Sequence, residues 1–162
     1  MTERSKRVHE LLLTRGATVA TAESLTGGQL AALLTAAPGA SDTFLGGVVS
    51  YATAVKEDLL GVDASIVAAY GVVSADCAQA MARGVRALMG STYGLSTTGV
   101  AGPAEQEGKS PGTVFVGLAG PDGASAVSLE LAGDRAAITR RTCEEALSAF
   151  VDVLRQEETG LR

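Results

Sequence analysis

Histidine is almost absent from this sequence, which contains a single one, His9, in 162 residues. A Ser-His-Asp triad would need that imidazole in the active site. His9 falls in an N-terminal helical pattern far from any glycine-rich loop, so we expect it on the surface of that helix. The 2 cysteines, Cys77 and Cys143, lie far apart without the spacing of metal ligands, and we expect small core residues. The sequence therefore predicts no metal site and no bound cofactor.

Aromatic residues are also scarce, at 4% with no tryptophan, so the core has to be built from Ala, Val and Leu. The hydrophobic content of 46% excludes a disordered chain, and the length suits one domain over residues 1–162. A net charge of -5 disfavours nucleic acid as a partner. No window approaches the roughly 18 apolar residues of a membrane span. The charged N-terminus lacks a secretion signal, so we expect a soluble, cytoplasmic protein.

Two common phosphate-binding signatures are missing as well. The chain has no G-x-x-x-x-G-K-[ST], and GVAGPAEQEG does not place G-x-G-x-x-G between a strand and a helix. P-loop and Rossmann dinucleotide sites are thereby disfavoured. A phosphohydrolase that uses other glycine-rich corners for phosphate stays open, and it would depend on a divalent metal ion.

The order of elements indicates the fold class. Apolar periodicity, caps and glycine stops predict helices at 3–15, 27–37, 53–60, 75–89 and 135–157. Strands are predicted at 17–22, at 43–51, before the glycine-rich loop that follows STTG, and as a hairpin at 112–120 and 124–132 joined by PDG. Strands alternate with helices early and pair directly late. This pattern predicts an α/β three-layer domain with a mixed β-sheet and helices on both faces.

The segment TAESLTGGQL, 21–30, is the first candidate for chemistry, because a strand ends here and a helix begins after two glycines. Such a corner offers unpaired N–H groups to an anion or to an oxyanion beside a nucleophile. Ser24 would be that nucleophile, and Glu23 directly before it is a candidate for contact with the substrate. In the alternative interpretation, Ser24 or Thr26 only caps the helix.

A serine needs a base, and without a usable histidine the realistic one is a lysine with a lowered pKa. Lys56 in SYATAVKEDLLGV follows an apolar strand, with Tyr51 five residues before it. Of the other lysines, Lys6 lies near the terminus and Lys109 in a polar loop. On an ordinary helix Lys56 would instead be a solvated charge beside Glu57 and Asp58.

A third segment, STTGVAGP at 96–103, places small hydroxyl residues before glycines at the end of a strand. Hydroxyls and N–H groups at such a position can face a ligand, which makes Thr98 and Gly99 candidates for a pocket wall. The alternative is a plain glycine-rich connection.

In their order along the chain, AESLTGG, SYATAVKEDLLGV and TTGVAGP followed by PGTVFVGLA resemble the C-terminal domain of the CinA competence/damage-inducible protein family. The similarity runs over about residues 5–155. Stand-alone members, called PncC, are nicotinamide mononucleotide (NMN) amidohydrolases, and this chain resembles that form. The resemblance implies hydrolysis of the carboxamide of NMN to nicotinate mononucleotide and ammonia, in pyridine-nucleotide recycling.

The resemblance also implies roles for residues in a metal-independent mechanism. Ser24 would be the nucleophile, Lys56 the general base and Tyr51 a hydroxyl that relays or orients the proton. N–H groups around Thr26, Gly27 and Gly28 would complete the site, and Thr98 with Gly99 would contact the substrate.

This chain departs from the family pattern at two places. The loop reads AGPAEQEGKSPG where the family commonly shows AGPGG. In GDRAAITRR, Thr139 stands at the usual arginine position, which leaves Arg140 as the candidate for contact with the substrate phosphate. A catalytically degenerate module that binds a pyridine nucleotide or a partner protein is the alternative function. The resemblance and the Ala-rich apolar helix faces also suggest a homo-oligomer.

Overall fold

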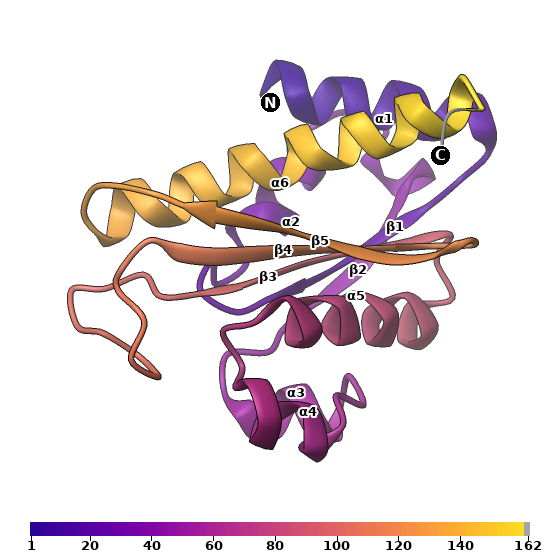
Figure 1. Cartoon of the computed structure of the whole chain (residues 1–162). Coiled ribbons are helices and arrows are strands. Elements are labelled where there is room, and N and C mark those ends of the chain that lie inside the picture. The colour runs from indigo at the N-terminus through magenta and orange to yellow at the C-terminus, as the bar shows by residue number, and fades with distance from the viewer. Residues whose placement is uncertain (161–162) are drawn as a thin grey trace.

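A computed structural model describes residues 1–160 of the chain and shows a five-stranded mixed sheet between two layers of helices (Figure 1). The predicted α/β class, with helices on both faces of a mixed sheet, is confirmed. The elements run α1 (Glu3–Arg15), β1 (Val19–Glu23), α2 (Gln29–Thr35), the 3₁₀ turn η1 (Ala40–Asp42), β2 (Phe44–Val49), α3 (Thr53–Asp58), α4 (Ala64–Tyr70), α5 (Ala75–Met89), β3 (Tyr93–Gly99), β4 (Thr113–Gly120), β5 (Gly123–Glu130) and α6 (Arg135–Glu158).

The strand order is β2-β1-β3-β4-β5. β1 is parallel to both of its neighbours, β2 and β3, whereas β4 is antiparallel to both β3 and β5. The chain leaves β1 for β2 on one side and then returns past β1 to β3 on the other. Right-handed crossovers therefore place α2 and α5 on opposite faces of the sheet. Ligands of such sheets bind beyond the carboxyl ends of the parallel strands, where the direction of the crossovers changes.

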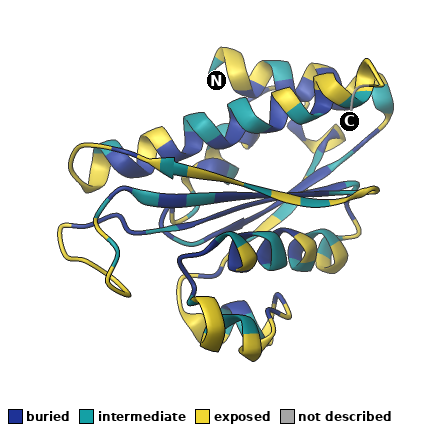
Figure 2. Ribbon diagram, in the orientation of Figure 1, coloured by how far each residue is buried: buried dark blue, intermediate teal, exposed yellow. Residues whose placement is uncertain are grey.

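Two apolar cores flank the sheet, and buried residues line both of its faces (Figure 2). On one face α1, α2 and α6 cover a core that includes Leu12, Leu30, Leu95 and Phe150. On the other face α5 contributes Met81 and Val85 to a second core. A small third cluster at the carboxyl end of the sheet contains Leu25, Ala101, Val114, Leu131 and Ile138.

Small residues let α5 lie close to the sheet, which explains how a core with few aromatic residues can be well packed. A Cβ atom on Gly94 of β3 would meet the backbone oxygen of Ala82, and one on Gly117 of β4 would meet that of Ala78. The Ser96 hydroxyl donates to the same Ala78 oxygen at 2.5 Å. Close packing of this kind fixes the height of α5 over the strands.

The predicted elements are all present, with ends that shift by up to two residues. The side chain of Ser74 caps α5 and accepts from the N–H of Cys77, as the sequence predicted. The helix α4 was not predicted; it is only seven residues long and none of them is buried. Within the described residues, no helix is both long and apolar enough to cross a membrane.

The prediction of a surface position for His9 is wrong. His9 is buried with 7% exposure, and its Nε2 lies 2.7 Å from the Leu34 oxygen while its Nδ1 contacts the Thr43 hydroxyl. These two contacts join α1 to the last turn of α2 and to the residue after η1. The histidine is therefore a structural residue of the helical layer.

Candidate active site

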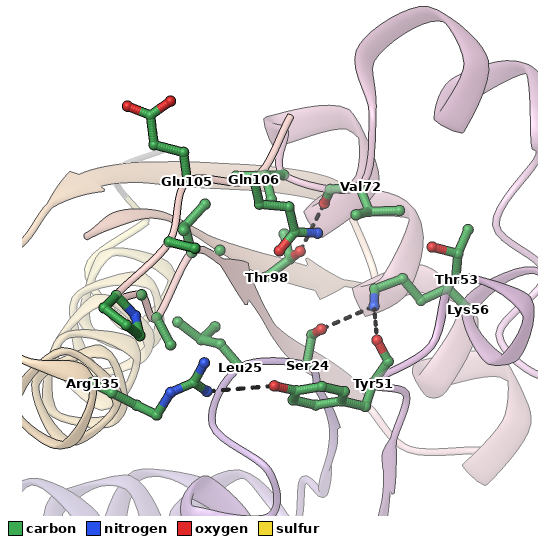
Figure 3. A pocket seen from close by; sticks show the side chains of 17 residues that line it. Ser24, Leu25, Tyr51, Thr53, Lys56, Val72, Thr98, Glu105, Gln106 and Arg135 are labelled. Atoms are coloured by element: carbon green, nitrogen blue, oxygen red, sulfur yellow. Dashed lines mark hydrogen bonds between the residues drawn. The ribbon is translucent and has the colours of Figure 1, made fainter. Parts of the chain in front are cut away.

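The carboxyl ends of the three parallel strands lie side by side, since Glu23 of β1 is in register with both Val49 of β2 and Thr97 of β3. The residues that follow each strand are consequently brought together from three parts of the chain. They line a cavity of about 310 Å³ (Figure 3). Its lining comprises Ser24, Leu25, Tyr51, Thr53, Lys56, Val72, Val73, residues 98–106 and Arg135.

Ser24 is fixed by backbone bonds to both neighbouring strands. Its own N–H donates to the Thr97 oxygen at 3.0 Å, and the Glu23 oxygen accepts from the Ser50 N–H at 2.8 Å. Its side chain is half-buried and opens into the cavity. The corner therefore holds the hydroxyl in place while leaving it accessible.

Lys56 reaches Ser24 from α3 and is surrounded by acceptors. Its Nζ lies 2.9 Å from Ser24 Oγ, 2.7 Å from the Ser50 oxygen and 3.1 Å from the Tyr51 oxygen. Only 1% of the residue is exposed. A protonated amine would donate to all three oxygens. A neutral amine would keep its two N–H groups on the carbonyls and turn its lone pair toward the serine hydroxyl.

Burial lowers the pKa of Lys56 below its ordinary value of 10.5, and the charges of Cys77 and Glu107 raise it by smaller amounts. Because burial is the largest cause, the environment shifts the protonation equilibrium of Lys56 toward the neutral amine. No ion pair to a carboxylate offsets this effect among the described residues. The alternative of a solvated surface lysine is therefore wrong.

Tyr51 contributes differently from the expected hydroxyl relay. Its backbone oxygen accepts from Lys56, whereas its hydroxyl accepts from Arg135 Nη1 at 3.5 Å (Figure 3). In the described chain that hydroxyl makes no hydrogen bond to Ser24 or Lys56. The residue is 60% exposed and lines the cavity.

Glu23, the residue before Ser24 that was predicted to contact the substrate, has mainly a structural role. Glu23 is 1% exposed, and its carboxylate accepts from the N–H groups of Leu30 and Ala31 at 2.8 and 3.0 Å and from the Thr26 hydroxyl at 2.6 Å. It thus caps α2 in place of a residue at the N-cap, where Gly28 has no side chain to do so.

The positions of Thr26, Gly27 and Gly28 also differ from the expectation, because none of them lines the cavity. Thr26 is buried and also contacts the Thr97 hydroxyl at 2.8 Å. The N–H of Gly27 donates back to the Ser24 oxygen at 3.1 Å. The family resemblance implied that N–H groups at this helix start are free for the substrate, whereas here the chain itself satisfies several of them.

Thr98 and Gly99 both line the cavity, as the pattern of the third segment predicted. The Thr98 hydroxyl donates to the Val72 oxygen at 2.7 Å, which ties β3 to the segment before α5. A Cβ on Gly99 would meet the Thr113 oxygen at 2.7 Å. The absence of a side chain at Gly99 lets β3 lie close to β4 and leaves only backbone atoms at this part of the cavity wall.

Arg140 is exposed and does not line the cavity, so its predicted contact with substrate is not supported by its position. Arg135, the first residue of α6, lies at the cavity instead. The five helical steps from Arg135 to Arg140 rotate the side-chain direction by about 140° past a full turn, which sends the two side chains to different faces. Thr139 is 5% exposed and accepts from Gln29 at 3.4 Å. Arg135 was not predicted as a site residue, although it follows the capping residue Asp134 directly in the sequence.

Cys77 and Cys143 are buried core residues, as expected. Burial raises the pKa of the Cys77 thiol to about 11 and that of Cys143 to about 12. Both thiols are therefore poor nucleophiles near neutral pH. In the described part of the chain, no three His, Cys, Asp or Glu side chains come together as a metal site would require.

Comparison with known proteins gives a consistent family match. The family model of the CinA C-terminal domain matches residues 1–154. A CinA-like protein of Frankia casuarinae is 54% identical over 151 residues, which cover 93% of this chain and 34% of that protein. A CinA-like protein of Synechocystis is 51% identical over 129 residues, or 79% of this chain and 31% of that protein. The chain thus spans about a third of the length of these curated relatives.

Solved structures of similar length share the fold. The crystal structure of a CinA superfamily protein from Klebsiella pneumoniae has a TM-score of 0.92 at 32% identity, covering 95% of this chain and 97% of that one. A competence/damage inducible protein from Agrobacterium tumefaciens has a TM-score of 0.87 at 28% identity, covering 96% and 98%.

Proposed function

This chain belongs to the CinA C-terminal domain family, and from that membership we propose that it is an NMN amidohydrolase with a serine nucleophile and a lysine base. The substrate would be the carboxamide of NMN, and the products nicotinate mononucleotide and ammonia. The observation that supports this proposal most directly is the 2.9 Å contact between Lys56 Nζ and Ser24 Oγ.

In the acylation step, the Ser24 oxygen attacks the carboxamide carbon while its proton passes to the neutral Lys56 amine. The carbonyl oxygen of the substrate becomes an oxyanion. When the tetrahedral intermediate collapses, the carbon–nitrogen bond breaks and Lys56 returns the proton to the leaving nitrogen, which departs as ammonia. The two carbonyl oxygens of Ser50 and Tyr51 hold the amine in place through both transfers.

In the deacylation step, a water molecule takes the place of the ammonia and gives its proton to Lys56 as it attacks the ester. The carbon–oxygen bond to Ser24 then breaks, and Lys56 returns the proton to the serine oxygen. The product carboxylic acid ionises after release. Lys56 thus accepts and returns a proton in both halves of the reaction, and the proposed steps balance without a metal ion.

The developing oxyanion needs at least one donor. Leu25 follows Ser24 directly and lines the cavity, and its N–H donates to no acceptor within the described residues. We assign it as the backbone donor. Leu25 thereby takes the role that the sequence had given to Thr26, Gly27 and Gly28.

The rest of the cavity suits a substrate with a positive ring and a phosphate. The exposed Tyr51 ring offers an aromatic face to the pyridinium of NMN. Arg135 carries the one permanent positive charge among the lining residues, which suits it to the phosphate. A second hollow shares Leu25 and Arg135 with this cavity and gives the phosphate further room.

Release of ammonia from NMN, measured with and without excess chelator, tests the proposal. We expect turnover in both conditions, and we expect Ser24→Ala to abolish it while thermal unfolding stays close to that of the wild type. The matched control is Ser148→Ala, on the outer helical layer. NMN-dependent stabilisation without any ammonia would instead favour the degenerate binding module, and loss of activity in chelator would favour a metal-dependent enzyme.

A further inference from the structure

The loop between β3 and β4 is fastened to the segment before α5 by one carboxylate. Glu107 Oε2 accepts from the N–H of Val72 at 3.0 Å, and Oε1 accepts from the N–H of Val73 at 2.8 Å. Lys109 Nζ donates to the Val73 oxygen from the same loop. Val72 and Val73 form one wall of the cavity, and residues 101–106 of the loop form another.

The backbone conformation of the loop directs the Glu107 carboxylate toward Val72 and Val73. Gln106 and Lys109 exchange two backbone hydrogen bonds of 3.1 and 2.9 Å, which close a tight turn around Glu107 and Gly108. Both central residues have positive φ, 54° and 71°. Glu107 is the one non-glycine residue with positive φ in residues 1–160, and such a conformation persists only where contacts hold it.

The receiving segment is shaped to accept the carboxylate. Gly71 has a φ of 77°, and a Cβ on it would collide with Glu107 Oε2. The Val72 oxygen in turn accepts from the Thr98 hydroxyl at 2.7 Å, so the segment is held from two sides (Figure 3). Val72 and Val73 are 7% and 1% exposed, although Glu107 itself is exposed.

We propose that Glu107 is a positioning residue whose carboxylate clasps the Val72–Val73 backbone and so keeps the cavity walls closed beside the Lys56 amine. The clasp excludes water from the base without touching the reacting atoms. This inference rests on the proposed function for its kinetic consequences, whereas its structural consequences can be measured without any turnover.

The clasp has a pH signature that a simple charge effect would not have. The negative charge of Glu107 raises the pKa of Lys56, so losing the charge alone would lower that pKa. Burial is the larger influence and lowers it. Opening the walls to water would therefore raise the pKa and move the acid limb of kcat/KM to higher pH. The other ionisable groups near Lys56 or on the cavity lining are Tyr51, Glu57, Asp58, Cys77, Glu105 and Arg135.

The test compares Glu107→Ala with Glu130→Ala, which removes an exposed carboxylate at the end of β5. For Glu107→Ala we expect amide hydrogen exchange at Val72 and Val73 to become roughly ten- to hundredfold faster, because each N–H loses its hydrogen bond to a charged carboxylate. We expect kcat/KM for NMN to fall roughly tenfold, with its acid limb at higher pH. Glu107→Gln, which keeps one acceptor oxygen, should recover part of the protection.

Unchanged exchange at both valines would overturn the clasp, and so would an acid limb that moves to lower pH. If the wild type releases no ammonia from NMN, the proposed function fails instead. In that case amide exchange still tests the clasp, together with the pH dependence of reductive methylation at Lys56. The exposed position of Glu107 means that neither variant removes core packing.

Discussion

Lys56 Nζ and Ser24 Oγ lie 2.9 Å apart although 32 residues separate them in the chain. The contact joins the residue after β1 to Lys56, the one buried residue of α3, and two backbone oxygens also accept from the amine. A hydroxyl beside a buried amine is the arrangement that the proposed serine–lysine mechanism requires.

Lys56→Arg separates the role of a base from that of a positive charge. Arginine keeps the charge but cannot be deprotonated in a protein, so we expect kcat for ammonia release to fall by about 10²–10⁴-fold, as for loss of a general base. Steady-state kinetics with NMN measure this. If Lys56→Arg kept near-normal kcat, a charge alone would suffice and the assigned mechanism would be wrong.

The rate should depend on pH through Lys56. Burial lowers its pKa below 10.5, and only the neutral amine can accept the serine proton. The value of kcat/KM should therefore rise with pH as the amine loses its proton, and the midpoint should lie below 10.5. A pH profile of the wild type measures that midpoint. The residual rate of Lys56→Ala serves as the control and should lack this limb.

Arg135 should act on the phosphate of the substrate. We expect Arg135→Ala to raise KM for NMN by roughly ten- to hundredfold, as expected for a hydrogen bond between charged groups. With nicotinamide riboside, which has no phosphate, the same variant should differ little from the wild type. Arg140→Ala, five residues further along α6, is the matched control. Equal effects of both variants on NMN would contradict this assignment.

Glu23 should matter for stability, because its carboxylate caps α2 from a fully buried position. Glu23→Gln leaves an amide group facing a backbone N–H, and we expect a loss of about 1–3 kcal/mol in the free energy of unfolding. Chemical denaturation measures the difference, with Glu130→Gln as the exposed control. A variant as stable as the wild type would show that the carboxylate is not needed as a cap.

The two cysteines should be inert in the folded protein. Burial raises the pKa of both thiols, to about 11 for Cys77 and about 12 for Cys143, so little thiolate exists near neutral pH. We expect Ellman's reagent to react slowly with the native protein and with both thiols after unfolding in guanidinium. Rapid modification of either native thiol, with parallel loss of activity, would point to cysteine chemistry.

Local patterns in the sequence were sufficient for the five strands, for every α-helix except α4, and for two central residues. Apolar periodicity, the Ser74 cap and the PDG turn act over a few neighbouring residues, and the structure has those elements where they were expected. The scarcity of histidine and lysine reduced the choice of base to Lys56. The structure brings Lys56 to Ser24, which sequence spacing alone could not establish.

Tertiary structure decided which neighbours of that pair face the cavity. Glu23 turns to α2 and Arg135 replaces Arg140, because strand alternation and helix rotation send adjacent side chains in different directions. Glu107 meets Val72 and Val73 only because the β3–β4 loop folds back over the start of α5. The sequence by itself determined the strands, the α-helices other than α4, and the chemical types of side chain available. The order of the strands decided which residues meet at their carboxyl ends, since contacts between distant segments depend on how whole elements pack.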